Sequence, residues 1–187
     1  MAEMLLFHHA QGLTDGVRAF ADGLRAAGHV IHTPDLFEGK TFATLDEGIA
    51  HFEELGFRTI LDRGRAAAYG LPDNVVHAGF SMGVLPAQML AQTRPGVKAA
   101  VLFSAAIPMG QFSDDWPSGV PLQVHTMEDD ELGDLPDARK LVDTVPGAEL
   151  FLYPGDRHLF ADSTLVSYDE DATALASQRV LDLLARL

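Results

Sequence analysis

Six short apolar segments alternate with helix-like segments along this chain, and this alternation restricts the fold more than any other feature of the sequence. The apolar segments are rich in Val, Leu, Ile and Phe, and they are apolar at both odd and even positions. A strand that is buried on both faces of a parallel sheet has this pattern. The predicted strands are Met4–His9, His29–Thr33, Val75–Phe80, Ala99–Ser104, Pro121–Met127 and Glu149–Tyr153.

The segments between these strands have the apolar spacing of helices. Helices are predicted after a cap at Thr14 or Asp15 as far as Gly28, from Asp46 to Tyr69, from Met82 to about Gln92, over the stripe 138–145, and from about Glu170 to Leu187. We expect a break or kink in the second of these, near Gly56 or Gly64. Strand followed by helix, repeated to the end, predicts an α/β fold with a six-stranded, mainly parallel sheet and helices on both faces. No repeat or low-complexity linker interrupts the pattern, so residues 1–187 are expected to form one domain.

The composition excludes several classes of partner and site. Asp and Glu number 27 against 13 Lys and Arg, which gives a net charge of −14. This charge repels phosphate backbones and anionic lipids, so neither nucleic acid nor a membrane surface is an expected partner. The chain has no Cys, which excludes disulfides, thiolate zinc sites and a cysteine nucleophile. No apolar run approaches the ~20 residues of a membrane span, and the first strand begins too early to follow a signal peptide. A cytoplasmic protein is therefore expected.

A G-x-S-x-G motif, Gly79–Gly83, connects the third predicted strand to an apolar helix. In this strand–turn–helix context the motif is typical of a nucleophile elbow. We expect Ser81 to lie in a strained turn at the sheet edge, because side chains at Gly79 and Gly83 would collide with the neighbouring strand and helix. The start of a helix also favours a developing negative charge. The alternative is a chance match, which the flanking strand and helix make several-fold less frequent. Ser81 is the predicted nucleophile.

A general base and an acid are expected after the serine, each just beyond a strand end. The acidic run Glu128–Glu131 follows the fifth predicted strand, and His158 follows the sixth. His158 is a candidate base because His125, the nearest alternative, lies inside a predicted strand. In isolation, His158 could equally be a surface histidine and the acidic run a solvated turn. The spacing of these residues does not decide which of the four carboxylates orients the imidazole, and Asp129 and Asp130 are both candidates.

These features together resemble the dienelactone hydrolase family of α/β hydrolases over nearly the whole chain. The resemblance rests on residues 5–13, 33–37, 79–83, 124–130 and 153–158. It implies an α/β-hydrolase fold with a catalytic triad of Ser81, Asp130 and His158. It also implies that the backbone N–H groups of Met82 and Ala10 form the oxyanion hole. No metal and no organic cofactor is implied.

The chain departs from the family pattern at three positions and at its first strand. The best-known members have Cys where this chain has Ser81, so His158 must act as a true general base. A Glu that interacts with that thiol is matched by His9. An Arg that often holds a substrate carboxylate is matched by Asp162, which favours a neutral substrate over dienelactone. The usual sheet begins with two antiparallel strands that we do not find, which predicts a minimal version of the fold.

Other residues near the predicted site are candidates for the substrate pocket. They are His9, Gln11, Phe37, Met109 and Trp116. A packed satellite cluster is an equal alternative for the last two, which lie in the loop after the fourth strand. We expect one of His8 and His9 to face the site and the other the core. A metal site there is not expected, because no matching carboxylate accompanies the pair. His77 and His125 are expected to be hydrogen-bonded core residues.

The sequence therefore predicts a serine hydrolase that cleaves small carboxylic esters or lactones through an acyl-enzyme on Ser81. The alternative is a non-catalytic protein of the same fold that binds a small ligand or partner, which needs no triad. Ester, lactone and thioester cleavage use the same groups, and the sequence leaves the choice between them open. The length leaves no room for a separate lid, which favours small, accessible substrates. Both a monomer and a homodimer agree with the sequence.

Overall fold

One sheet of six strands runs through the middle of the molecule, and its strands are all parallel to their neighbours. The structure is a computed structural model that describes residues 1–187. The strands are β1 (Glu3–Phe7), β2 (Val30–His32), β3 (Val76–Phe80), β4 (Ala99–Phe103), β5 (Leu122–Met127) and β6 (Glu149–Tyr153). Their order across the sheet is β2-β1-β3-β4-β5-β6. The predicted α/β fold class and all six predicted strands are confirmed.

Six α-helices connect or follow the strands. They are α1 (Asp15–Ala26), α2 (Leu45–Leu55), α3 (Phe57–Ala68), α4 (Val84–Thr93), α5 (Leu135–Thr144) and α6 (Glu170–Ala185). Thr14 caps the start of helix α1, because its hydroxyl accepts a hydrogen bond from the Val17 N–H. The predicted long helix is broken at Gly56, while Gly64 lies inside α3. No helix combines the length and the apolar character that crossing a bilayer requires.

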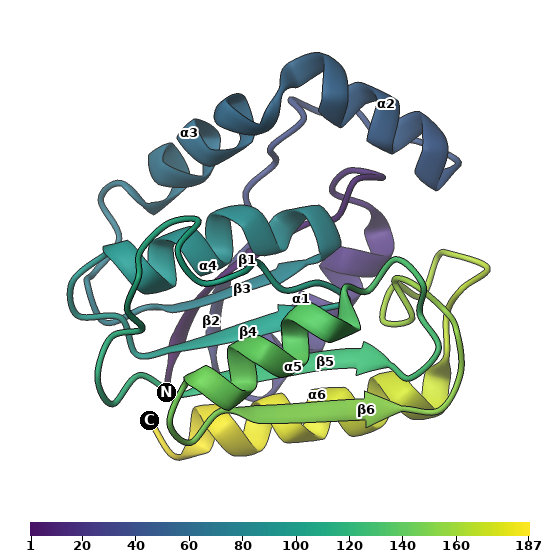
Figure 1. Ribbon diagram of the computed structural model, residues 1–187. Coiled ribbons are helices and arrows are strands. Elements are labelled where there is room, and N and C mark those ends of the chain that lie inside the picture. The colour runs from purple at the N-terminus through teal and green to yellow at the C-terminus, as the bar shows by residue number, and fades with distance from the viewer.

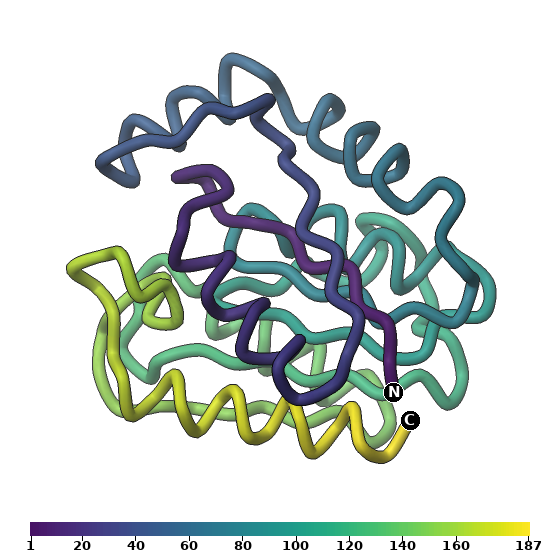
Figure 2. Tube along the Cα trace, turned by 180° about the vertical axis from the view of Figure 1, so that it is seen from behind, coloured from purple at the N-terminus to yellow at the C-terminus, as the bar shows by residue number.

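Both faces of the sheet are covered by helices, which explains why the strands are apolar at every position. Successive side chains of a strand point to opposite faces. In β1, Leu5 and Phe7 pack with α3, α4 and α5, whereas Met4 and Leu6 pack with α1 and α6. Figure 1 shows α4 against the sheet with α2 and α3 outside it, and Figure 2 shows α1 and α6 on the opposite face.

One prediction about a buried side chain is wrong. His77 was expected to be hydrogen-bonded, but neither of its buried ring nitrogens has a partner. His125 does match the expectation, because its Nδ1 lies 2.7 Å from the Tyr153 hydroxyl.

The order of the strands places a topological switch point between β1 and β3. The chain passes from β1 to β2 through α1 on one face, and from β2 to β3 through α2 and α3 on the other. Strand β1 therefore lies between β2 and β3, and Phe7 pairs with Gly79. Open α/β sheets bind ligands where connections diverge to opposite faces in this way, beyond the carboxyl ends of the strands.

Candidate active site

Ser81 follows β3 directly and lies in a tight turn that only a narrow set of sequences can form. It begins a short 3-10 turn, Ser81–Gly83, and has a φ of 49°, a left-handed conformation that is uncommon outside glycine. A Cβ at Gly79 would lie 2.1 Å from the Gly83 carbonyl oxygen, and one at Gly83 would lie 2.5 Å from that of Phe7. The two glycines are therefore needed for the turn to press against β1, as the motif predicted.

His158 lies between Ser81 and Asp130 and is hydrogen-bonded to both. Its Nε2 is 2.8 Å from Ser81 Oγ, and its Nδ1 is 2.8 Å from Asp130 Oδ2. The Asp130 side chain is 1% exposed, and its Oδ1 accepts a hydrogen bond from the Leu132 N–H at 3.0 Å. Because a carboxylate only accepts, Nδ1 carries the proton, and Nε2 is left to accept the serine hydroxyl hydrogen. This is the tautomer that a general base needs.

The acidic run Glu128–Glu131 supplies one carboxylate to this chain of hydrogen bonds. Asp130 contacts His158, whereas the Asp129 side chain is exposed. Instead, the Asp129 N–H donates to the Gly155 carbonyl at 2.9 Å, which ties the turn after β5 to the turn after β6. Sequence spacing did not distinguish Asp129 from Asp130; in the structure, Asp130 contacts the imidazole.

The backbone of the loop after β1 faces the elbow. The Ala10 N–H has no acceptor within the protein, whereas the two N–H groups that follow it do: the Gln11 N–H donates to His9 Nδ1 and the Gly12 N–H to the His9 carbonyl. Met82 directly follows Ser81 in the 3-10 turn. Since β1 and β3 are adjacent strands, both predicted oxyanion donors lie at the same edge of the sheet as Ser81.

His8 and His9 are both buried, and neither lines a depression beside His158. His8 Nδ1 donates to the His9 carbonyl at 2.7 Å, and its Nε2 accepts from the Leu36 N–H at 2.9 Å. Burial lowers the pKa of His8 to about 4, so it is neutral at pH 7. His9 Nε2 lies 2.8 Å from Asp162 Oδ2. Asp162 is 3% exposed, so it does not present its charge to a substrate, contrary to the argument from its position.

Two depressions adjoin His158. The first, of about 520 Å³, lies between the start of α2 and the loop before α6, and Gln11 is part of its lining. Its aliphatic walls are Leu45, Leu159, Leu165 and Val166. The second, of about 490 Å³, is largely acidic. Its carboxylates are Asp129, Asp130, Glu131 and Asp156. No group of three or more His, Cys, Asp and Glu side chains is arranged to hold a metal ion.

Comparison with known proteins places this chain in a family. The family model described as "Dienelactone hydrolase family" matches residues 2–187. The chain belongs to the dienelactone hydrolase family. It is a hydrolase of the α/β fold, and this family membership implies a small-molecule substrate. A search of curated proteins found no match.

Solved structures of similar fold agree with this family assignment. A promiscuous, dienelactone hydrolase-like phosphotriesterase from metagenomic libraries has a TM-score of 0.80 and 21% identity, covering 100% of this chain and 87% of its own. A protein of the α/β-hydrolase superfamily from Xanthomonas campestris has a TM-score of 0.68 and 23% identity, with both chains covered completely. A dienelactone hydrolase from Anabaena variabilis has a TM-score of 0.67 and 15% identity, covering 99% of this chain and 87% of its own.

Of the predicted pocket residues, Gln11 lines the first depression. Phe37 is 1% exposed and packs edge-on against His8, so it is a core residue. Met109 and Trp116 pack against the core on the α4 side of the sheet. The Trp116 indole N–H also donates to a backbone carbonyl four residues later. Met109 and Trp116 therefore belong to a packed cluster and do not form a pocket wall.

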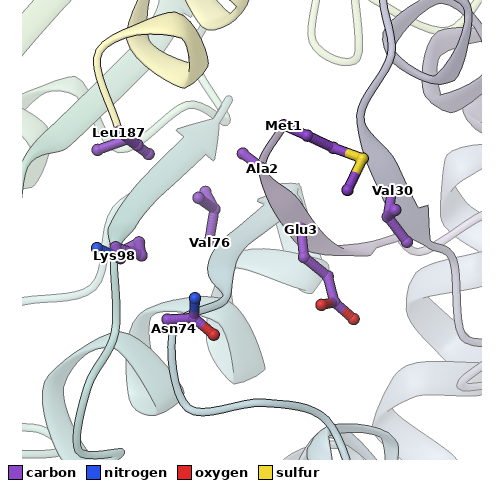
Figure 3. A pocket seen from close by; sticks show the side chains of 8 residues that line it. All are labelled: Met1, Ala2, Glu3, Val30, Asn74, Val76, Lys98 and Leu187. Carbon is purple, nitrogen blue, oxygen red and sulfur yellow. The ribbon is translucent and has the colours of Figure 1, made fainter.

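A third depression lies at the opposite edge of the sheet, near both chain termini (Figure 3). It measures about 150 Å³ and lies at the amino ends of the strands. Its polar side chains are Glu3, Asn74 and Lys98, and it contains no serine or histidine. Ser81 and His158 are therefore brought together at the carboxyl ends of the strands and not here.

Proposed function

We propose that this protein is a serine hydrolase that cleaves small carboxylic esters or lactones through an acyl-enzyme on Ser81. One observation carries the proposal: the continuous hydrogen-bond chain from Ser81 Oγ through His158 to Asp130, with both links at 2.8 Å. A serine hydroxyl is a weak nucleophile until a base takes its proton, and this arrangement supplies the base in the required tautomer.

Acylation uses His158 first as a base and then as an acid. The imidazole Nε2 takes the hydroxyl proton as Ser81 Oγ attacks the ester carbonyl carbon. The carbonyl oxygen becomes an oxyanion, which the N–H groups of Met82 and Ala10 stabilise, an effect of about 3 kcal/mol per donor. Asp130 stabilises the imidazolium that forms. The C–O bond then breaks, and His158 returns its proton to the leaving alkoxide oxygen.

Deacylation repeats these steps with water as the nucleophile. His158 deprotonates the water, which attacks the acyl carbon and releases the acid and the free Ser81 hydroxyl. For a lactone the leaving alcohol stays attached to the acyl group, so one product forms in place of two. The residues invoked need no metal or organic cofactor for either step.

The surroundings of His158 favour small, neutral substrates. The first depression offers aliphatic walls to an acyl or alkyl group beside the base. The second is lined by carboxylates such as Asp129 and Asp156, which repel an anionic substrate. We propose a single domain over residues 1–187 with no separate lid, which leaves the site open to small molecules.

Hydrolysis of p-nitrophenyl acetate by the wild type and by Ser81→Ala tests this function. The proposal predicts turnover by the wild type and a loss of several orders of magnitude in kcat for the variant. A panel of acetate, butyrate and γ-lactone substrates then separates ester from lactone preference. Cleavage by Ser81→Ala at the wild-type rate would contradict the proposal.

A binding protein without catalysis is the alternative, and a fluorophosphonate probe distinguishes the two. An activated serine is phosphonylated, whereas an ordinary serine is not. The proposal predicts labelling of folded wild type at Ser81 and none in Ser81→Ala. Absence of labelling in folded wild type, together with absence of ester turnover, favours the binding protein.

A further inference from the structure

A second histidine–carboxylate pair lies beside the proposed triad and takes no part in the steps above. His9 follows β1, and Asp162 lies four residues after His158. Their side chains are 1% and 2% exposed, and His9 Nε2 lies 2.8 Å from Asp162 Oδ2. The two residues are 153 positions apart in the sequence, so the fold and not the local chain brings them together.

Asp162 is held rigidly in its place. Its Oδ2 also accepts a hydrogen bond from the Thr14 hydroxyl, and its Oδ1 accepts from the Thr164 N–H and hydroxyl at 2.8 and 2.6 Å. A Cβ at Gly16 would lie 1.7 Å from Oδ1, so the backbone of α1 closes the remaining space. Burial acts to raise the pKa of Asp162, but these hydrogen bonds and that from His9 outweigh it and lower the pKa to about 2.

His9 in turn shapes the loop that carries Ala10. Its Nδ1 accepts from the Gln11 N–H at 3.2 Å, so Nε2 carries the proton that Asp162 accepts, and the ring is neutral. The His9 carbonyl accepts from the Gly12 N–H at 3.0 Å. The His9 ring and carbonyl therefore accept the N–H groups of Gln11 and Gly12, while the Ala10 N–H donates to no acceptor within the protein.

We propose that His9 and Asp162 are positioning residues that fix the Ala10 N–H for the oxyanion. Asp162 lies in the same turn as His158, because its N–H donates to the Leu159 carbonyl at 3.1 Å. The pair thus joins the loop of the oxyanion donor to the loop of the base. The inference rests on the proposed function. It predicts that loss of the pair weakens oxyanion stabilisation and leaves the Ser81–His158 contact in place.

A matched oxoester and thionoester separate these two effects. The sulfur of a thionoester accepts hydrogen bonds poorly, so its hydrolysis depends less on oxyanion donors while still using Ser81 and His158. We expect His9→Leu and Asp162→Asn to lower kcat for the oxoester by about 10- to 100-fold. The thionoester kcat should fall less than about threefold, so the oxoester preference narrows. His9→Gln, which keeps a donor near Asp162, should recover part of the loss.

The control is His77→Leu, which removes a buried histidine from the adjacent strand β3. It should leave the preference for the oxoester unchanged. Circular dichroism and thermal unfolding confirm that each variant folds. An equal loss of kcat on both substrates, or no loss, would overturn the inference. Failure of His9→Leu, Asp162→Asn and His9→Gln to fold would also overturn it, because the pair would then be needed for folding. A wild type that cleaves neither ester fails the proposed function itself, which is a distinguishable result.

Discussion

The chemistry of this site depends on which of four neighbouring carboxylates meets an imidazole. Asp130 Oδ2 lies 2.8 Å from His158 Nδ1, and burial keeps water from competing for that contact. Asp129, one residue earlier, is exposed and contributes only its backbone N–H. The two residues therefore form a natural pair of test and control.

Asp130→Asn should lower kcat for p-nitrophenyl acetate by about 10³- to 10⁴-fold, because an amide favours the wrong imidazole tautomer. Asp129→Asn removes one exposed charge and should stay within about twofold of the wild type. Steady-state kinetics on the two purified variants measure both effects. A large loss in Asp129→Asn with a small loss in Asp130→Asn contradicts the assignment.

Residues that belong to local motifs can be predicted from the sequence, whereas residues whose contacts depend on distant packing cannot. Ser81 and His158 were predicted because a glycine-flanked serine and a histidine after a late strand are local signals. The assignment of Phe37 to the substrate pocket was wrong. An apolar side chain in a loop gives the same sequence pattern whether it packs in the core or lines a cavity. Contact between His9 and Asp162 was not foreseen, because no spacing encodes a partner 153 residues away.

Among the elements, the strand–turn–helix junction from β3 to α4 constrains the sequence most. The apolar runs predicted all six strands to within a few residues, because both faces of the sheet are buried. The break between α2 and α3 was predicted, but its position was narrowed only to Gly56 or Gly64. Gly56 ends α2 with a φ of 80°, while Gly64 lies against Pro86, and periodicity alone does not distinguish the two.

Gly83→Ala should disrupt this junction. Its Cβ would lie 2.5 Å from the Phe7 carbonyl oxygen, and relief of that clash moves the elbow away from β1. We expect the free energy of unfolding to fall by about 1–3 kcal/mol or more. Gly23→Ala, on an open face of α1, should instead raise it by about 0.5–1 kcal/mol. Urea unfolding curves measure both, and a Gly83→Ala protein as stable as the wild type contradicts the packing described.

At the scale of the whole molecule, buried neutral histidines make the fold sensitive to acid. Burial lowers the pKa of His8 to about 4 and those of His77 and His125 to about 3. In the unfolded chain each binds a proton near pH 6.5. The unfolded state therefore holds more protons between pH 6.5 and the folded pKa, and the stability of the folded state falls as the pH drops through that range.

His77→Leu isolates one of these contributions. The wild-type ring has no hydrogen-bond partner, so its replacement should raise the free energy of unfolding by about 1–3 kcal/mol at pH 7.5. The advantage should widen by about 1.4 kcal/mol for each pH unit below 6.5, down to about pH 3. Denaturation at several pH values measures the difference. A gap that stays constant with pH contradicts a neutral, unpartnered His77.

Direct observation of an acyl group on Ser81 is the most immediate test of catalysis by this serine. The wild type is mixed with a slowly hydrolysed p-nitrophenyl ester, quenched in acid within the first turnovers, and analysed as intact protein and as peptides by mass spectrometry. We predict one added acyl group, located on Ser81 and absent from Ser81→Ala. Ester turnover that persists in Ser81→Ala, with no acyl group on the serine of the wild type, would contradict it.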